Sequence, residues 1–189
     1  MTSKPVERIV VPHIYVDTNV FAGILDGQHR ASIHLLQIIK EKNWRCSTSM
    51  FALMELSEIR QDNKFIYSQV GLGVHIKKAF RSLDQKNLPP DELANTQEAI
   101  DTVFSESYPF VGFFWLEKIG WDRALELKAS TNISVADCIH LATAIEAGCD
   151  LLVTLDTFFR KEAESFIKSC LPEQVNKTLQ ELGFNITAL

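Results

Sequence analysis

The chain has 189 residues, of which 46% are hydrophobic and 23% are charged. These fractions are ordinary for globular proteins, so they exclude disordered and low-complexity classes, and the length predicts a single domain over residues 1–189. The formal net charge is −5. The protein therefore has no overall positive field that would hold a polyanion without specificity.

The four cysteines indicate buried thiols, because no pair has the Cys-x-x-Cys spacing and the chain is too long for so sparse a disulfide framework. No stretch approaches the roughly 18 uncharged apolar residues that a membrane span needs. The short apolar run near the N-terminus contains Pro12 and ends at Asp17, unlike a signal peptide. We expect a cytoplasmic protein without membrane contact.

The predicted elements alternate between strands and helices. In chain order they are a strand over 9–16, a helix from 19, a helix over 31–42, a strand over 44–48, helices over 49–59, 60–86 and 92–104, a strand over 111–116, helices over 121–129 and 134–147, a strand over 151–155 and a helix over 158–167. Strands separated by helices predict an α/β fold, a three-layer α/β/α sandwich with a central parallel sheet. The helical stretch at about 60–108 is interpreted as an insertion or arm.

Two acidic residues directly follow predicted strands. Asp17 comes after Ile14-Tyr15-Val16, and Asp156 comes after the strand that ends at Leu155. Because ligands of open α/β sheets bind at the carboxyl ends of parallel strands, these carboxylates are candidates for a functional site. Each of them also fits a plain structural role, as the cap of the next helix or as an Asx turn.

Two further acids belong to predicted helices. Asp137 is the last residue of Ser134-x-x-Asp137, which fits a capping box, although the start of this helix also faces the expected cleft. Glu55 lies at the border of an apolar helical stripe, about 40° from Ile59 at 100° per residue. It is either a solvent-facing side chain beside the core or a group that reaches into an acidic cleft, and Glu58, one turn away, is the alternative for that role.

These residues, in this order, resemble the PIN domain family. The resemblance rests on Val16-Asp17-Thr18-Asn19, on a Glu within an apolar helix, on Ser134-x-x-Asp137-Cys-Ile-His-Leu-Ala-Thr-Ala, and on Thr154-Leu155-Asp156-x-x-Phe159. Among PIN proteins the chain is most similar to VapC-like toxin nucleases, with a longer middle.

The resemblance implies a metal-dependent endoribonuclease that hydrolyses phosphodiester bonds of single-stranded RNA, with Asp17, Glu55, Asp137 and Asp156 as catalytic metal ligands. Asn19 and Thr154 match polar positions that orient water or a carboxylate. Carboxylates that converge repel one another, so a hard divalent cation, Mg²⁺ or Mn²⁺, is needed to keep them ionised. The family also suggests the role of a toxin, with an antitoxin and a second copy of the chain as candidate partners.

Basic residues gather in the middle of the chain. Residues 60–86 contain six Lys and Arg against two Asp, a local net charge of +4. We predict that this arm contacts RNA phosphates through Lys64, Lys77, Lys78 and Arg81, although a charged helix face is often simply solvated.

Two other classes stay open at this point. A haloacid-dehalogenase-like phosphatase also has an Asp after its first strand, but it needs a second Asp where this chain has Asn19. A catalytically inactive RNA- or protein-binding module would keep the fold without the chemistry. His140, one turn after Asp137, is either a support or ligand of the acidic site or a satisfied histidine at the core edge.

Overall fold

A computed structural model describes residues 11–25, 27 and 29–186 of the chain. Its centre is a parallel sheet of five strands in the order β3-β2-β1-β4-β5. The strands are β1 (His13–Val16), β2 (Arg45–Ser49), β3 (Val111–Phe114), β4 (Leu151–Val153) and β5 (Ser169–Cys170). The predicted α/β sandwich with a parallel sheet is therefore confirmed.

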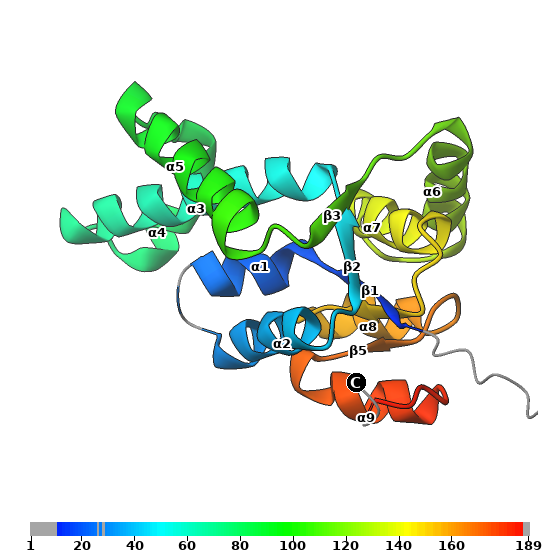
Figure 1. Cartoon of the computed structure of the whole chain (residues 1–189). Coiled ribbons are helices and arrows are strands. Elements are labelled where there is room, and N and C mark those ends of the chain that lie inside the picture. Colours follow the sequence, from blue (N-terminus) through cyan, green and yellow to red (C-terminus); the bar gives the residue numbers. More distant parts are fainter. Residues whose placement is uncertain (1–10, 26, 28, 187–189) are drawn as a thin grey trace, which may run out of the picture.

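Helices join successive strands and cover both faces of the sheet (Figure 1). The α-helices are α1 (Thr18–Leu25), α2 (Arg30–Glu41), α3 (Phe51–Gly71), α4 (Ile76–Arg81), α5 (Pro90–Thr102), α6 (Lys118–Ser130), α7 (Val135–Glu146), α8 (Thr157–Ala163) and α9 (Val175–Glu181). Shorter turns are the 3₁₀ helices η1 (Leu83–Gln85) and η3 (Pro172–Gln174) and the π-helical turn η2 (Val103–Ser107).

The alternation of side chains along β1 divides the core into two clusters. Ile14 and Val16 face a cluster built with α1, α2, α5 and α9, whereas Tyr15 faces a second cluster built with α6, α7 and α8. All four residues of β1 are buried, as expected for a central parallel strand whose two faces are both covered. The sheet thus forms the middle of three layers.

Many observed elements differ from the predicted ones only at their ends, but the predicted helices over 49–59 and 60–86 are instead one helix, α3, followed by α4 and η1. The first strand was predicted over 9–16, but within the described residues it begins at His13, and 9–10 lie outside them. The N-cap of α3 is Met50 instead of Ser49, whose hydroxyl nevertheless accepts a hydrogen bond from Phe51 N–H. The prediction missed β5 and α9. β5, at the edge of the sheet, has two residues and is too short for any periodic pattern.

Helices α3, α4 and α5 extend to one side of the sheet (Figure 1). Both α4 and α5 pack on α3, and α3 and η2 connect this group to α1 and to β3. Glycines separate α3 from α4, since α3 ends at Gly71 and Gly73 has a positive φ of 85°. None of the helices in the described part of the chain has the length and apolar character of a membrane-spanning segment.

Candidate active site

The carboxyl ends of β1 and β4 lie side by side because the two strands pair in parallel, with Val16 opposite Val153. Asp17 follows β1, and its backbone N–H donates to the carbonyl of Val153 at 3.0 Å. Asp156 follows β4 by a few residues and caps α8. The topology therefore places both acids at one edge of the sheet, as the sequence predicts.

Asp17 lies at the centre of a buried hydrogen-bond network. Its Oδ1 accepts from the backbone N–H of Thr18 at 2.7 Å, and its Oδ2 accepts from the hydroxyl of Thr154 at 2.7 Å. The amide of Asn19 donates to the same Thr154 hydroxyl at 3.0 Å and accepts from Leu155 N–H at 2.9 Å. Asn19 and Thr154, both selected from the sequence, thus fix the carboxylate of Asp17 and tie the end of β1 to the end of β4.

The first turns of α3 bring Glu55 to the same place. Its Oε2 accepts from the hydroxyl of Thr18 at 2.6 Å and contacts Nε2 of His140 at 2.5 Å. Glu58, the alternative from the sequence, is turned away: its side chain is 72% exposed and pairs with Lys86 at 3.6 Å. The structure therefore brings Glu55, and not Glu58, to Asp17.

His140 is almost completely buried and connects the two acids. Its Nε2 lies 3.8 Å from Oδ1 of Asp17, in addition to the contact with Glu55. Its Nδ1 is 2.6 Å from the hydroxyl of Tyr15, a residue of β1 that points to the same layer. The interpretation of His140 as a support of the acidic site agrees with this geometry.

Asp137 and Asp156 both engage helix N-termini. Asp137 and Ser134 form the predicted capping box of α7, in which Ser134 N–H donates to Oδ2 of Asp137 at 3.1 Å. Asp156 accepts from the backbone N–H groups of Phe158 and Phe159 through Oδ1, at 2.7 and 2.8 Å. Among the described residues no hydrogen bond joins the carboxylate of Asp137 or Asp156 to Asp17 or Glu55, the inner pair, but the backbone N–H of Asp156 donates to the Thr154 hydroxyl at 3.0 Å.

Burial and charge determine the protonation of the inner residues. Burial raises the pKa of Asp17 above its ordinary value, while His140, Thr154 and Thr18 partly oppose this shift. For His140, burial favours the neutral ring, but the hydrogen bond to Glu55 and the charge of Asp17 outweigh it and raise the pKa. Burial also acts on Glu55, yet its bond and ion pair with His140 lower the pKa. Glu55 and His140 therefore form an ion pair beside a carboxylate that is costly to ionise.

The donor chemistry of this site fits a hard divalent cation. Carboxylate oxygens are the preferred ligands of Mg²⁺ and Mn²⁺, and the buried carboxylate of Asp17 is the kind of group that a cation stabilises in its ionised form. None of the hydrogen bonds between described residues uses Oε1 of Glu55. Within residues 11–25, 27 and 29–186, however, no three His, Cys, Asp or Glu side chains are already close enough to hold a metal ion. The inner pair has the donor chemistry for a cation, and among the described residues neither Asp137 nor Asp156 completes a three-residue group with it.

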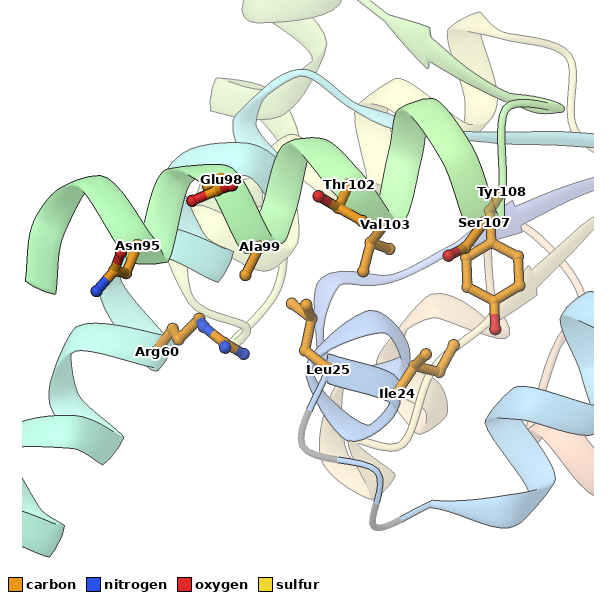
Figure 2. Close-up of a pocket in the computed structure, with 10 residues that line it drawn as sticks. All are labelled: Ile24, Leu25, Arg60, Asn95, Glu98, Ala99, Thr102, Val103, Ser107 and Tyr108. Carbon is orange, nitrogen blue, oxygen red and sulfur yellow. The ribbon is translucent and has the colours of Figure 1, made fainter.

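Glu55 also lines a surface cavity of about 520 Å³ between the start of α3 and the arm. Its wall includes Phe51 and Met54 on the site side and Lys86 and Gln97 on the arm side. This groove leads from the inner acids along α3. A second cavity, of about 510 Å³, lies between α1, α3 and α5, where Arg60 extends toward Leu25 (Figure 2), and it contains none of the candidate acids.

The basic residues predicted to contact RNA fall into two groups. Lys64 forms an ion pair with Glu92 of α5, so its charge is already balanced within the arm. Lys77, Lys78 and Arg81 are exposed on α4, and among the described residues no carboxylate forms an ion pair with them. Of the four predicted phosphate contacts, the three on α4 are therefore the ones without an ion-pair partner among the described residues.

Sequence reasoning did not select Tyr15 and Thr18. Both are part of the stretch that marks the end of β1, but a strand tyrosine normally indicates a core position and a threonine after Asp normally indicates a helix start. A usable signal was the polar hydroxyl on an otherwise apolar buried strand, because a buried hydroxyl needs a hydrogen-bond partner.

The fold and the site define a class: a three-layer α/β/α protein with an acidic site at the carboxyl edge of a five-stranded parallel sheet. The model of the PIN domain matches residues 14–164. The chain therefore belongs to the PIN domain family.

Among solved structures, the chain is similar to FitAB bound to an IR36 DNA fragment, at 15% sequence identity and a TM-score of 0.51, over 85% of this chain and 95% of that one. It is also similar to FitAcB from Neisseria gonorrhoeae, at 15% identity and a TM-score of 0.49, over 84% of this chain and 97% of that one. Comparison with curated proteins finds no match. At these identities the structural likeness shows the fold alone.

Proposed function

We propose that this protein is a metal-dependent endoribonuclease that hydrolyses phosphodiester bonds of single-stranded RNA. The observation that carries the proposal is the pair of Asp17 and Glu55, which one buried network joins at the carboxyl edge of a PIN-family sheet. The family match and the use of the Asn19 amide within this network favour a nuclease over the phosphatase alternative.

Each acid has a defined part in the proposed reaction. Asp17 and Glu55 would hold the cation, Mg²⁺ or Mn²⁺, and Asp137 and Asp156, at the starts of α7 and α8, would complete the set of ligands. When bound, such a cation lowers the pKa of water and offsets the charge that develops on the phosphate oxygens. Thr154 and Asn19 keep the Asp17 carboxylate oriented through the reaction, and no side chain acts as a nucleophile.

The substrate path is the second part of the proposal. The groove along α3 leads from Glu55 toward the arm, and α4 carries the unbalanced cations Lys77, Lys78 and Arg81. We infer that the RNA strand lies in this groove and that its phosphates contact these cations. Lys64 would also contact a phosphate, in place of its ion pair with Glu92. In this proposal residues 1–189 form one domain and 60–108 are its helical arm.

Cleavage of labelled single-stranded RNA in the presence of Mg²⁺ or Mn²⁺ tests the activity. EDTA should abolish cleavage, and Asp137→Asn, purified identically, should reduce it by about 100-fold or more, because loss of a ligand costs at least as much as loss of a supporting contact. Circular dichroism establishes that the variant is folded. Absence of cleavage by the unaltered protein over varied RNAs, together with no rise in melting temperature on adding metal, would favour the inactive binding module.

The cellular role is a separate part of the proposal. We propose that the protein is the toxin of a toxin–antitoxin pair, supported by the family and by the fold shared with FitAB. Expression of the unaltered chain should arrest growth, and expression of Asp137→Asn should not. A homodimer is proposed as well, and light scattering would then give twice the chain mass of 21.4 kDa.

A further inference from the structure

His140 is a buried polar residue within an apolar helix. Its exposed fraction is 1%, and its neighbours on α7, Ile139 and Leu141, belong to the core. A buried imidazole is costly unless its nitrogens are hydrogen-bonded. Here both nitrogens are bonded, and their partners belong to three other elements: β1, α1 and α3.

The network requires a hydrogen on Nε2 of His140, and in the ion pair with Glu55 the other ring nitrogen, Nδ1, is protonated as well. The hydroxyl of Thr18 donates to Oε2 of Glu55, so its oxygen is free to accept from His140. A carboxylate only accepts, so Nε2 of His140 must carry the hydrogen that points at Oε2 of Glu55, at 2.5 Å, and toward the Thr18 oxygen, at 3.1 Å. The Tyr15 hydroxyl at Nδ1, 2.6 Å away, holds the ring in this orientation.

Glu55 has few other restraints. Its side chain is 22% exposed and lies near the negative charge of Asp17, and among the described residues its other hydrogen bond is to the Thr18 hydroxyl. Without a further restraint, the Glu55 side chain would turn into the groove that it lines. This orientation lowers both its repulsion from Asp17 and the cost of removing its carboxylate from water. The contact with His140 holds it inward.

We propose that His140 is a positioning residue: with its ring held by Tyr15, it fixes the Glu55 carboxylate beside Asp17, where the two acids can share one cation. This inference rests on the proposed function for the identity of the cation. In this proposal Tyr15 and His140 hold the Glu55 carboxylate in its metal-binding position before the metal binds.

Mn²⁺ binding, followed by electron paramagnetic resonance of the free ion, tests the inference without any cleavage assay. His140→Leu replaces the donor with an apolar side chain that suits the buried position, and we expect Mn²⁺ affinity to fall by about 10- to 100-fold, the usual cost of losing a group that orients a ligand. His140→Gln places an amide N–H near the position of Nε2 and should restore most of the affinity. Tyr15→Phe should weaken binding by about 2- to 10-fold, as expected for one lost hydrogen bond.

His13 offers a matched control. It is also a buried histidine bonded to a hydroxyl, that of Ser47 at 2.7 Å, but it lies at the opposite, amino end of β1. His13→Leu should lower stability and leave Mn²⁺ affinity unchanged. If the loss of affinity in His140→Leu only reflected a weakened fold, His13→Leu would show it too.

The outcomes separate the two proposals. Mn²⁺ affinity in His140→Leu equal to or above that of the unaltered protein would overturn the positioning role, even if RNA is cleaved. Weakened Mn²⁺ binding in a protein that cleaves no RNA would support the positioning role and contradict the nuclease. An unaltered protein that binds no Mn²⁺ would overturn both, and if His140→Leu does not fold, Tyr15→Phe decides.

Discussion

The ion pair of His140 and Glu55 makes folding stability depend on pH. The raised pKa of His140 means that the folded protein holds this proton more firmly than the unfolded chain does, so the stabilisation is complete below the ordinary histidine value of about 6.5 and is lost as pH rises through the folded value. The lowered pKa of Glu55 acts in the other direction, and its stabilisation is lost as pH falls below about 4.5. Between these limits the pair contributes fully.

We therefore predict that the difference in free energy of unfolding between the unaltered protein and His140→Gln narrows as pH rises from 6 to 9. Urea denaturation in EDTA, which keeps metal out of the comparison, measures this difference. The charged groups that act on the ring are Glu55, Asp17 and Asp137. A constant difference over this range would mean that the pKa of His140 is not raised.

Asp17 has the opposite effect on folding stability to the pair of His140 and Glu55. Burial raises its pKa, so ionised Asp17 costs stability as pH rises above its ordinary value. The structure tolerates this cost because Thr154 and Thr18 donate to both carboxylate oxygens. A buried carboxylate with a raised pKa at the carboxyl ends of the strands is typical of functional sites.

At the scale of elements, the start of α7 depends on the capping box. Ser134→Ala removes the hydroxyl that accepts from Asp137 N–H at 3.0 Å, and we expect a loss of about 1 kcal/mol in the free energy of unfolding. It also removes a restraint on the Asp137 backbone, so Mn²⁺ affinity should fall modestly. The control is Ser130→Ala, because Ser130 is the last residue of α6 and caps no helix N-terminus. An equal loss of unfolding free energy in both variants would argue against the cap.

The charge of α4 gives a second prediction for a single element. Reversal of Lys77 and Lys78 to Glu should flatten the dependence of RNA binding on salt, because each phosphate contact contributes about 0.7 to the slope for single strands. Filter binding of Asp137→Asn to RNA at several salt concentrations measures this slope. Reversal of Lys168 and Lys177, which changes total charge equally at the far end of the chain, should leave the slope unchanged. A slope unaltered by the α4 change would exclude this helix from the path.

At the scale of the whole molecule, stability comes from the two core clusters on either side of the sheet. Leu36 of α2 is completely buried, and Leu36→Ala should cost about 2–5 kcal/mol through lost burial and a cavity. Leu72 at the end of the arm is 79% exposed, so Leu72→Ala should change stability by less than about 0.5 kcal/mol. Thermal or urea unfolding compares the two, and similar losses would mean that Leu72 is covered in solution.

Most of the fold could be predicted from sequence because its signals are local. The apolar runs before Asp17 and Asp156, the capping box at Ser134 and the turn at Gly148, with its positive φ of 64°, are each written within a few residues. Since parallel strands align their carboxyl ends, these local signals also placed both acids at one edge. The strand β5 was not predicted, because two residues are too few to show a hydrophobic pattern.

The sequence by itself determined the fold class and singled out the candidate acids, with Glu55 and Glu58 as alternatives, and the polar residues beside them. Only the tertiary structure decided that Glu55 rather than Glu58 meets Asp17, that His140 joins them, and that Lys64 is already paired. Glu55 and His140 are 85 positions apart, and Tyr15 and His140 are 125 apart. Contacts of this kind depend on how α3 and α7 pack on the sheet. Packing across the entire core sets this arrangement, and no local sequence pattern encodes it.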